Sequence, residues 1–357
     1  IIGGALIILI ALVGVAIVLL GLGIMTLAIR QIIRSVISVL IPEGSDKLVE
    51  IIFQKRKLNK GPAVVVIGGG TGLSVLLRGI KSVTSNITAI VTVADDGGSS
   101  GRIRQELGII PPGDLRNCLV ALADTEPLME KLFQHRFGGA GDLTGHSFGN
   151  LYIAAMTEIL GDVELALKES SKVLAVRGRV LPSSKDTIRL VAYMDDGSVV
   201  EGEACIPLAR KKIKRLAIKP ADAAPVEAAL EAIRDADAVI LGPGSLYTSV
   251  LPNLLVKGIA EALRETQAVK IYICNVMTQP GETDGYTASD HLRAIIDHVG
   301  PGIVDYMVVN GQNIAPELQA IYAKQGAYPV AADIEAIEAL GVKSVKANII
   351  SETNLVR

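Results

Sequence analysis

A run of glycines after an apolar stretch is the first feature of this sequence that could take part in binding chemistry. The segment "VVVIGGGTG" begins at Val64, and its candidate contact residues are Gly68, Gly69, Gly70, Thr71 and Gly72. A helix that starts directly after such a loop offers unpaired backbone amides and the positive end of its dipole, and both attract phosphate. The spacing is not a full dinucleotide fingerprint, and no Gly-Lys-Ser/Thr follows for a P-loop. We expect these glycines to contact a phosphate, and a tight turn is the competing interpretation.

Two adjacent aspartates follow the next apolar stretch. Asp95 and Asp96 come after "ITAIVTVA", and Ser99 and Ser100 follow them in "DDGGSSG". A carboxylate at the end of a strand could accept a hydrogen bond from a ribose hydroxyl or hold a hydrated Mg²⁺ beside a diphosphate. The alternative is an ordinary turn. The serines and the nearby Arg102 favour a binding role.

A second glycine loop lies further along the chain. In "LGPGSLYTS", Gly242, Gly244 and Ser245 stand between an apolar strand pattern and a helical one, and Thr248 adds another hydroxyl. This loop is a second candidate for anion binding, and a glycine turn followed by a serine N-cap explains it equally well. Two such loops predict a nucleotide with a second phosphorylated group, or the two ends of one diphosphate.

Several polar side chains occupy similar positions after apolar stretches. Asn275 and Asn310 follow two further strand patterns and could bind a sugar or a base edge, or could equally close a loop. His146 and Asn150 lie in "GDLTGHSFGNLY", where we favour a ligand contact over packing and assign no catalytic base. Asp114, in "PPGDLRNC", is interpreted as a helix N-cap.

The elements that must position these residues alternate between strands and helices. From Ala63 onward, apolar strand patterns rich in β-branched residues are followed by polar or glycine-rich loops and then by helical periodicity. This alternation predicts a parallel sheet with helices on both faces, in which the loops after the strands share one edge. A hairpin signal at Asp196 and Gly197 predicts an antiparallel excursion over about residues 173–218.

The composition limits the classes of function. The chain has 357 residues and a formal net charge of −2, so it has no overall field that would attract nucleic acid. The basic run at residues 210–215 is interpreted as a solvated face. Its three cysteines have no paired spacing and are expected in the core of a protein from a reducing compartment.

The N-terminal segment is strongly apolar. No charged residue occurs from Ile1 to Ile29, and about 20 such residues span a bilayer, so we predict a transmembrane segment at 1–29 rather than a cleaved signal peptide. Residues 30–60 form a basic linker, in which residues 31–44 are expected to be an interfacial helix ended by Pro42. The excess of Lys and Arg after the span places the rest, residues 61–357, in the cytoplasm. Whether another span precedes Ile1 is left open.

Six long motifs together resemble one known family. They are "VVVIGGGTGLSVLLRGIK", "ITAIVTVADDGGSSGRIRQEL", "PPGDLRNCLVALAD", "LTGHSFGNL", "LGPGSLYTSVLPNLLVKGIAEA" and "CNVMTQPGETDGYT". They are similar to the gluconeogenesis-factor (YvcK-type) family of the CofD-like 2-phospho-L-lactate transferase superfamily, over nearly everything from Ala63 to Arg357. The apolar N-terminus lies outside this similarity.

The resemblance implies a Rossmann-like fold of CofD type and a regulator of cell shape and cell-wall precursor balance that binds a nucleotide sugar of the UDP-N-acetylglucosamine class. It implies no required cofactor. Tyr322 could stack on a base and Arg357 could pair with a diphosphate, although a core tyrosine and a frayed terminus are equally consistent with these positions. The alternative is a CofD-like transferase in which Asp95 and Asp96 place Mg²⁺ and an acceptor hydroxyl attacks a nucleotide diphosphate donor. Oligomeric state, including a homo-oligomer, is left open.

Overall fold

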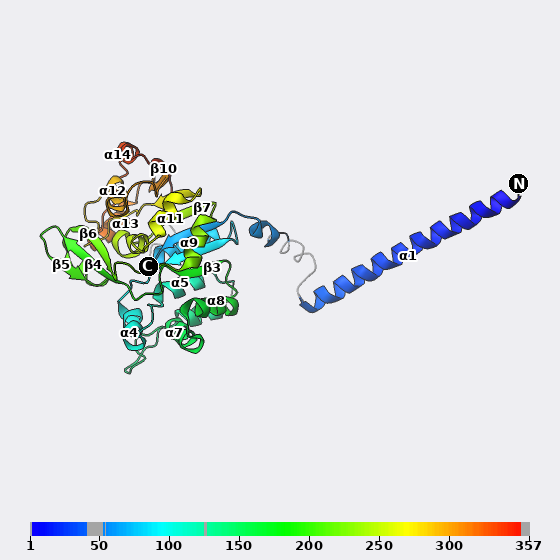
Figure 1. Ribbon diagram of the computed structural model, residues 1–357, viewed down its shortest axis with the longest axis horizontal. Coiled ribbons are helices and arrows are strands. Elements are labelled where there is room, and N and C mark those ends of the chain that lie inside the picture. Colours follow the sequence, from blue (N-terminus) through cyan, green and yellow to red (C-terminus); the bar gives the residue numbers. More distant parts are fainter. Residues whose placement is uncertain (1, 41–52, 54, 125–126, 351–357) are drawn as a thin grey trace. The chain divides into compact units, whose positions relative to one another are not determined.

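The computed structural model describes residues 2–40, 53, 55–124 and 127–350 (Figure 1). The chain divides into two compact units, residues 1–59 and residues 60–357, which are described here separately. Arg357 lies outside the described residues.

The first unit contains one long helix, α1 (Ile2–Leu40). Its residues Ile10–Ile32 have a mean hydropathy of 2.7 and no buried side chains, so this part is long and apolar enough to cross a membrane, as a signal sequence near an N-terminus also would be. The predicted span and the predicted interfacial helix belong to one continuous helix, which runs through Arg30 to Leu40. No helix-breaking residue separates the two predicted segments, and Pro42 lies outside the described residues.

The second unit is built on a seven-stranded parallel sheet in the order β10-β9-β8-β7-β1-β2-β3. Its strands are β1 (Val64–Gly68), β2 (Ile87–Val91), β3 (Arg179–Pro182), β7 (Ala238–Leu241), β8 (Val269–Ile273), β9 (Tyr306–Asn310) and β10 (Lys343–Ala347). The chain builds outward from β1 to β3 and then returns to the other side of β1 with β7. The strand order therefore reverses between β1 and β7, and such a reversal is where open α/β sheets bind ligands.

The helices of the second unit cover both faces of this sheet, as the alternating pattern predicts (Figure 1). They are α3 (Gly70–Ile80), α4 (Gly98–Leu107), α5 (Gly113–Leu122), α6 (Pro127–Gln134), α7 (Phe148–Leu160), α8 (Val163–Val173), η1 (Pro207–Ala209), α9 (Glu227–Arg234), η2 (Leu246–Val250), α10 (Leu251–Leu254), α11 (Ile259–Glu265), α12 (Ala288–Val299), α13 (Pro316–Ala323) and α14 (Ile334–Ala339). All five residues of β1 and of β2 are buried, which explains why these strands read as continuous apolar runs.

A small antiparallel sheet interrupts the alternation. Its order is β5-β4-β6, formed by β4 (Arg189–Met194), β5 (Val199–Glu201) and β6 (Ile213–Lys219). The predicted hairpin turn at Asp196 and Gly197 connects β4 to β5. The predicted start at residue 173 is too early, because β3 pairs in parallel with β2 and is the edge strand of the main sheet.

The glycine before β3 should be essential for stability. Gly178 has a φ of +91°, and a Cβ there would lie 2.3 Å from the Ile87 carbonyl oxygen. Because that oxygen belongs to a buried strand that cannot easily move, Gly178→Ala should lower the free energy of unfolding by at least about 2 kcal/mol. Urea denaturation of the unit from Lys60 onward measures this change.

Gly197→Ala is the matched control for backbone conformation. Gly197 has a φ of +85°, but a Cβ added there would have no atom within 4 Å, so only the backbone cost of about 1 kcal/mol applies. Equal losses in the two variants would show that the contact with Ile87 is unimportant.

Candidate functional site

The two glycine loops form one wall at the reversal point of the sheet. β1 pairs with β7, so the loop after each strand leaves the sheet beside the other. A Cβ on Gly72 would lie 2.9 Å from the Pro243 carbonyl oxygen, and one on Gly244 would lie 3.2 Å from the Gly69 carbonyl oxygen. Glycine at these positions therefore allows the two backbones to approach closely, and the two predicted anion sites are neighbours.

The first glycine loop also packs against a carboxylate. The backbone amide of Gly70 donates a hydrogen bond to Asp114 Oδ2 at 2.7 Å. A Cβ on Gly69 would lie 2.5 Å from Thr92 Cγ2 and 2.7 Å from the same aspartate oxygen. The interpretation of Asp114 as an N-cap is wrong, since α5 begins after Pro112 without a side-chain cap. Asp114 instead binds the start of α3.

A cavity of about 340 Å³ opens beside these loops. We call it the acidic cavity, and it is lined by Gly70, Thr71, Thr92, Asp95, Asp114, Glu203, Pro207, Ser245, Thr248, Ser249, Gln279 and Glu282. Four of these residues are carboxylic acids, several others carry hydroxyls, and none is Lys or Arg. Such a lining suits a ligand part that offers many hydroxyl groups.

The two predicted aspartates have different surroundings. Asp95 lines the acidic cavity and accepts a hydrogen bond from the Gly97 amide at 3.0 Å. Asp96 accepts hydrogen bonds from the amides of Glu203 at 3.0 Å and Ala204 at 2.9 Å. Asp96 thus fixes the segment after β5 and does not line the cavity.

Two glutamates of the cavity were not singled out from the sequence. Burial and neighbouring carboxylates raise the pKa of Glu203 to about 8, and burial raises the pKa of Glu282 to about 7. The Glu282 Oε1 atom accepts hydrogen bonds from Gln279 Nε2 at 2.6 Å and from Thr248 Oγ1 at 3.3 Å. Glu282 lies in the motif "PGETDGY", which could have drawn attention to it, whereas Glu203 lies in the antiparallel excursion and has no comparable signal.

Asp114 is a third carboxylic acid of the cavity whose pKa is raised by burial. Burial raises its pKa to about 6, because loss of water outweighs the hydrogen bond from Gly70.

Among the residues that the structure describes, no group of three His, Cys, Asp or Glu side chains has the arrangement of a metal site. The residues of the acidic cavity therefore do not fit an Mg²⁺ site of three or more such ligands.

A buried polar network lies behind the Asp95 loop. Ser99 Oγ is 3.1 Å from His146 Nδ1 and accepts a hydrogen bond from Asn150 Nδ2 at 3.1 Å. Arg116 donates to Ser147, whose hydroxyl caps α7. Burial and the nearby Arg102 lower the pKa of His146, which favours the neutral ring.

This network does not line the acidic cavity. Ser100 is also buried, and its hydroxyl packs against Gly113. No carboxylate in the described part of the chain hydrogen-bonds to the His146 ring, so Ser99 and His146 form no catalytic triad. Their geometry supports the loop that carries Asp95.

The remaining predicted residues are dispersed. Asn275 follows β8, and its buried Oδ1 has no hydrogen-bond partner. Asn310 closes its own loop by donating to the Gln312 carbonyl at 2.7 Å. Tyr322 is half-buried on α13 and does not line the acidic cavity. Ser245 lines the cavity at the start of η2.

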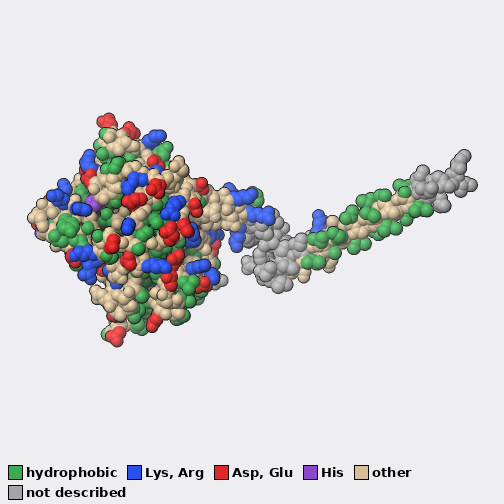
Figure 2. Space-filling view, viewed as in Figure 1, with side chains coloured by type: hydrophobic (Ala, Val, Ile, Leu, Met, Phe, Trp, Pro, Cys, Tyr) green, Lys and Arg blue, Asp and Glu red, His purple; other side chains and the backbone are tan. Residues whose placement is uncertain are grey.

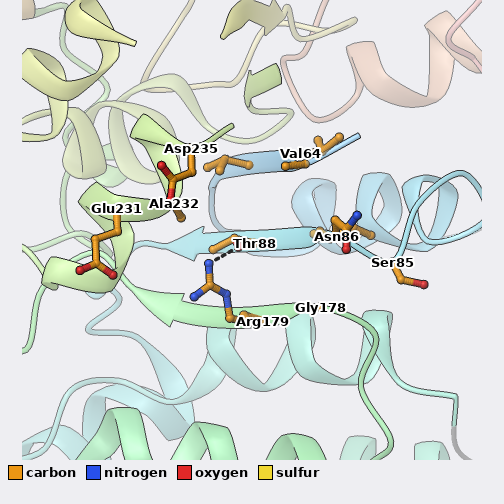
Figure 3. A pocket seen from close by; sticks show the side chains of 12 residues that line it. Val64, Ser85, Asn86, Thr88, Gly178, Arg179, Glu231, Ala232 and Asp235 are labelled. Carbon is orange, nitrogen blue, oxygen red and sulfur yellow. Dashed lines mark hydrogen bonds between the residues drawn. The ribbon is translucent and has the colours of Figure 1, made fainter. Parts of the chain in front are cut away.

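Another cavity, of about 330 Å³, lies at the opposite edge of the sheet (Figure 3). Val64 and Arg179 are at the beginnings of their strands there, and the Arg179 guanidinium donates to Thr88 Oγ1 at 3.2 Å. None of the predicted site residues lines it. Open α/β sheets bind ligands beyond the carboxyl ends of their strands, and this favours the acidic cavity as the functional site.

Comparisons with known proteins identify the family of this chain. A family model described as 2-phospho-L-lactate transferase CofD matches residues 64–350. The chain is 61% identical over 282 residues to the gluconeogenesis factor of Halalkalibacterium halodurans, covering 79% of this chain and 88% of that protein. It is 53% identical over 297 residues to the gluconeogenesis factor of Bacillus subtilis, covering 83% and 94%. A crystal structure of a UPF0052 family member from Bacillus halodurans superposes with a TM-score of 0.80 at 60% identity, covering 82% of this chain and 94% of that one.

The raised pKa of Glu282 should make stability depend on pH. Because its folded-state pKa of about 7 lies above the ordinary 4.5, the folded protein binds this proton more tightly than the unfolded chain does. The stabilising contribution of Glu282 to the free energy of unfolding is therefore fully present below pH 4.5. As the pH rises through 7, up to about 3 kcal/mol of that free energy is lost. Glu282→Gln keeps the acceptor oxygen and should reduce the slope of the unfolding free energy between pH 5 and about pH 7, leaving the part that comes from Asp114 and Glu203.

Urea denaturation at several pH values measures this slope. Glu227→Gln, on the exposed surface of α9, should keep the slope of the unmodified protein. If Glu282→Gln also kept that slope, the glutamate would not be protonated in this range.

Proposed function

The chain belongs to the gluconeogenesis-factor branch of the CofD family, and on this premise we propose that it is a regulator that binds a nucleotide sugar of the UDP-N-acetylglucosamine class. Its role would be to adjust cell shape and cell-wall precursor metabolism to the supply of that metabolite. The observation that carries the proposal is the acidic cavity at the reversal point of the sheet. Carboxylates, hydroxyls and the amide of Gln279 surround it, as a sugar ring with several hydroxyl groups requires.

The same cavity supports binding better than catalysis. Ser99 and His146 are paired but buried away from the cavity, and Asp114 and Glu282 are held by hydrogen bonds within the protein. Thr248 donates to Glu282 in the cavity at 3.3 Å, but the same carboxylate oxygen also accepts the shorter hydrogen bond from Gln279 at 2.6 Å. The family model's description names the alternative, a 2-phospho-L-lactate transferase. In the Mg²⁺-dependent form expected from the sequence, Asp95 and Asp96 would hold the metal. Both Asp96 oxygens accept backbone amides and Asp96 does not line the acidic cavity, which disfavours this alternative.

Blocking the acidic cavity tests the proposal. Thr71 is exposed and lines the cavity, so Thr71→Trp should weaken binding of UDP-N-acetylglucosamine at least tenfold, about 1.4 kcal/mol. Calorimetric titration with UDP-N-acetylglucosamine, UDP, NAD and GDP measures the change and compares the ligands.

Val75→Trp is the control, because Val75 is 60% exposed one turn further along α3 and does not line the cavity. Its affinity should equal that of the unmodified protein. Binding of GDP with no binding of the UDP compounds would favour the transferase alternative, and equal affinities for both tryptophan variants would place the ligand elsewhere.

We also propose that α1 anchors the protein in the cytoplasmic membrane with the second unit in the cytoplasm. The apolar residues Ile10–Ile32 and the basic residues after them support this orientation. A natural reporter exists, since Cys205 is exposed whereas Cys118 and Cys274 are buried. The expectation that all three cysteines lie in the core is therefore wrong for Cys205.

A membrane-impermeant maleimide should therefore label the protein only after the cells are permeabilised. Cys205→Ser should abolish the labelling and so identify the reacting thiol. Equal labelling of intact and permeabilised cells would reverse the proposed orientation.

A further inference from the structure

A larger cavity adjoins the acidic one. Its volume is about 540 Å³, and we call it the basic cavity. It lies between the segment leading into β6 and helix α12, and it is lined by Arg210, Lys211, Lys212, Ile213, Lys214, Tyr247, Glu282, Asp284, Gly285, Tyr286, Asp290, Arg293, Ala294, Asp297 and His298. Figure 2 shows Lys and Arg side chains at the end of this unit that carries β4, β5 and β6 in Figure 1.

The two cavities share Glu282 and meet along two short segments. On η2, Tyr247 lines the basic cavity and the next residue, Thr248, lines the acidic one. Between β5 and β6, Pro207 lines the acidic cavity and Arg210 the basic one. A ligand longer than one ring could therefore contact both cavities.

The charges of the two cavities differ in sign. The acidic cavity has four carboxylic acids and no basic side chain, whereas five Lys or Arg and four Asp or Glu side chains line the basic cavity. Two of the five are already paired, Lys211 with Asp196 at 2.7 Å and Arg293 with Asp290 at 3.0 Å. Some acids of the basic cavity already have partners. Asp284 accepts the Gly281 amide at 2.6 Å, and Asp290 accepts the Thr287 amide at 3.0 Å. A phosphate group would be repelled in the acidic cavity and attracted in the basic one.

The backbone at β6 directs one lysine toward this cavity. In the pairing of β4 with β6, Tyr193 is opposite Arg215 and Met194 is opposite Ile213, so Lys214 is the extra residue of a β-bulge. Bulges re-aim side chains and occur next to functional sites. Lys214 lines the basic cavity, whereas its neighbour Arg215 does not.

The wall of the basic cavity opposite the lysines is held in one arrangement. The hydroxyls of Tyr247 and Tyr286 are 2.7 Å apart. His298 Nδ1 lies 2.6 Å from the Ala294 carbonyl oxygen, and its Nε2 accepts the Leu216 amide at 2.8 Å. Both ring nitrogens are thus engaged in the neutral form, and His298 joins α12 to β6 without adding charge.

We propose that the phosphate groups of the ligand bind in the basic cavity, with Lys214 as a direct contact, and that the hydroxyl-rich part binds in the acidic cavity on the other side of Glu282. This proposal deepens the proposed function and rests on it for the identity of the ligand. It differs from the expectation that the glycine loops hold the phosphates. The Gly70 amide, which would have bound a phosphate there, already donates to Asp114.

The test reverses one charge at each of two adjacent positions on β6. Lys214→Glu and Arg215→Glu change the net charge equally, and both side chains are exposed. Calorimetric titration of the full chain in lipid nanodiscs uses UDP-N-acetylglucosamine, UDP and inorganic pyrophosphate. Lys214→Glu should weaken binding of all three at least tenfold, and Arg215→Glu should change it less than threefold. Lys214→Gln should give an intermediate loss.

The outcomes separate this inference from the proposed function. If the unmodified protein binds the UDP compounds and Lys214→Glu binds them equally well, the phosphates do not lie in the basic cavity, although the proposed function stands. If pyrophosphate binds and Lys214→Glu abolishes that binding while the UDP compounds never bind, the anion site is supported and the nucleotide-sugar proposal fails. Binding of none of the three compounds overturns both.

Discussion

The hydrogen bond from the Gly70 amide to Asp114 organises the centre of this fold. It joins the start of α3 to α5 at the point where the strand order reverses. The residue before Gly70 is also a glycine, because a Cβ on Gly69 would lie 2.5 Å from Thr92 Cγ2 and 2.7 Å from Asp114 Oδ2. The contact has a cost. Burial raises the pKa of Asp114 to about 6 even though the amide opposes that shift, so loss of water is the larger effect. Asp114 is nevertheless one of the four carboxylic acids that line the acidic cavity.

The sheet could be predicted largely from local patterns. The buried strands β1 and β2 consist mostly of β-branched residues, and glycines follow β1 and β7 directly, so strand positions and the shared edge were readable from the chain. β3 was harder to assign. It has four residues, and only its pairing with β2 distinguishes it from the antiparallel excursion that follows.

The side chains at the site were less predictable, because their roles depend on contacts distant in sequence. Asp96 and Asp95 are adjacent, yet Asp96 binds amides 107 and 108 residues away. Asp114 looked like a helix cap because caps are local, and its actual partner is 44 residues earlier. Glu203 reaches the cavity only because the small sheet folds back over the carboxyl ends of the strands. The local periodicity of hydrophobic residues does not indicate contacts between residues that are distant in sequence.

The small sheet belongs to a single stretch of chain between the end of β3 at Pro182 and the start of α9 at Glu227. That one stretch contributes Glu203 and Pro207 to one cavity and Arg210 to Lys214 to the other. The loops after β1 and β7 supply the glycines, and α5 supplies Asp114, independently of this stretch. An exchange of this stretch between relatives would therefore alter ligand preference while the scaffold stayed the same.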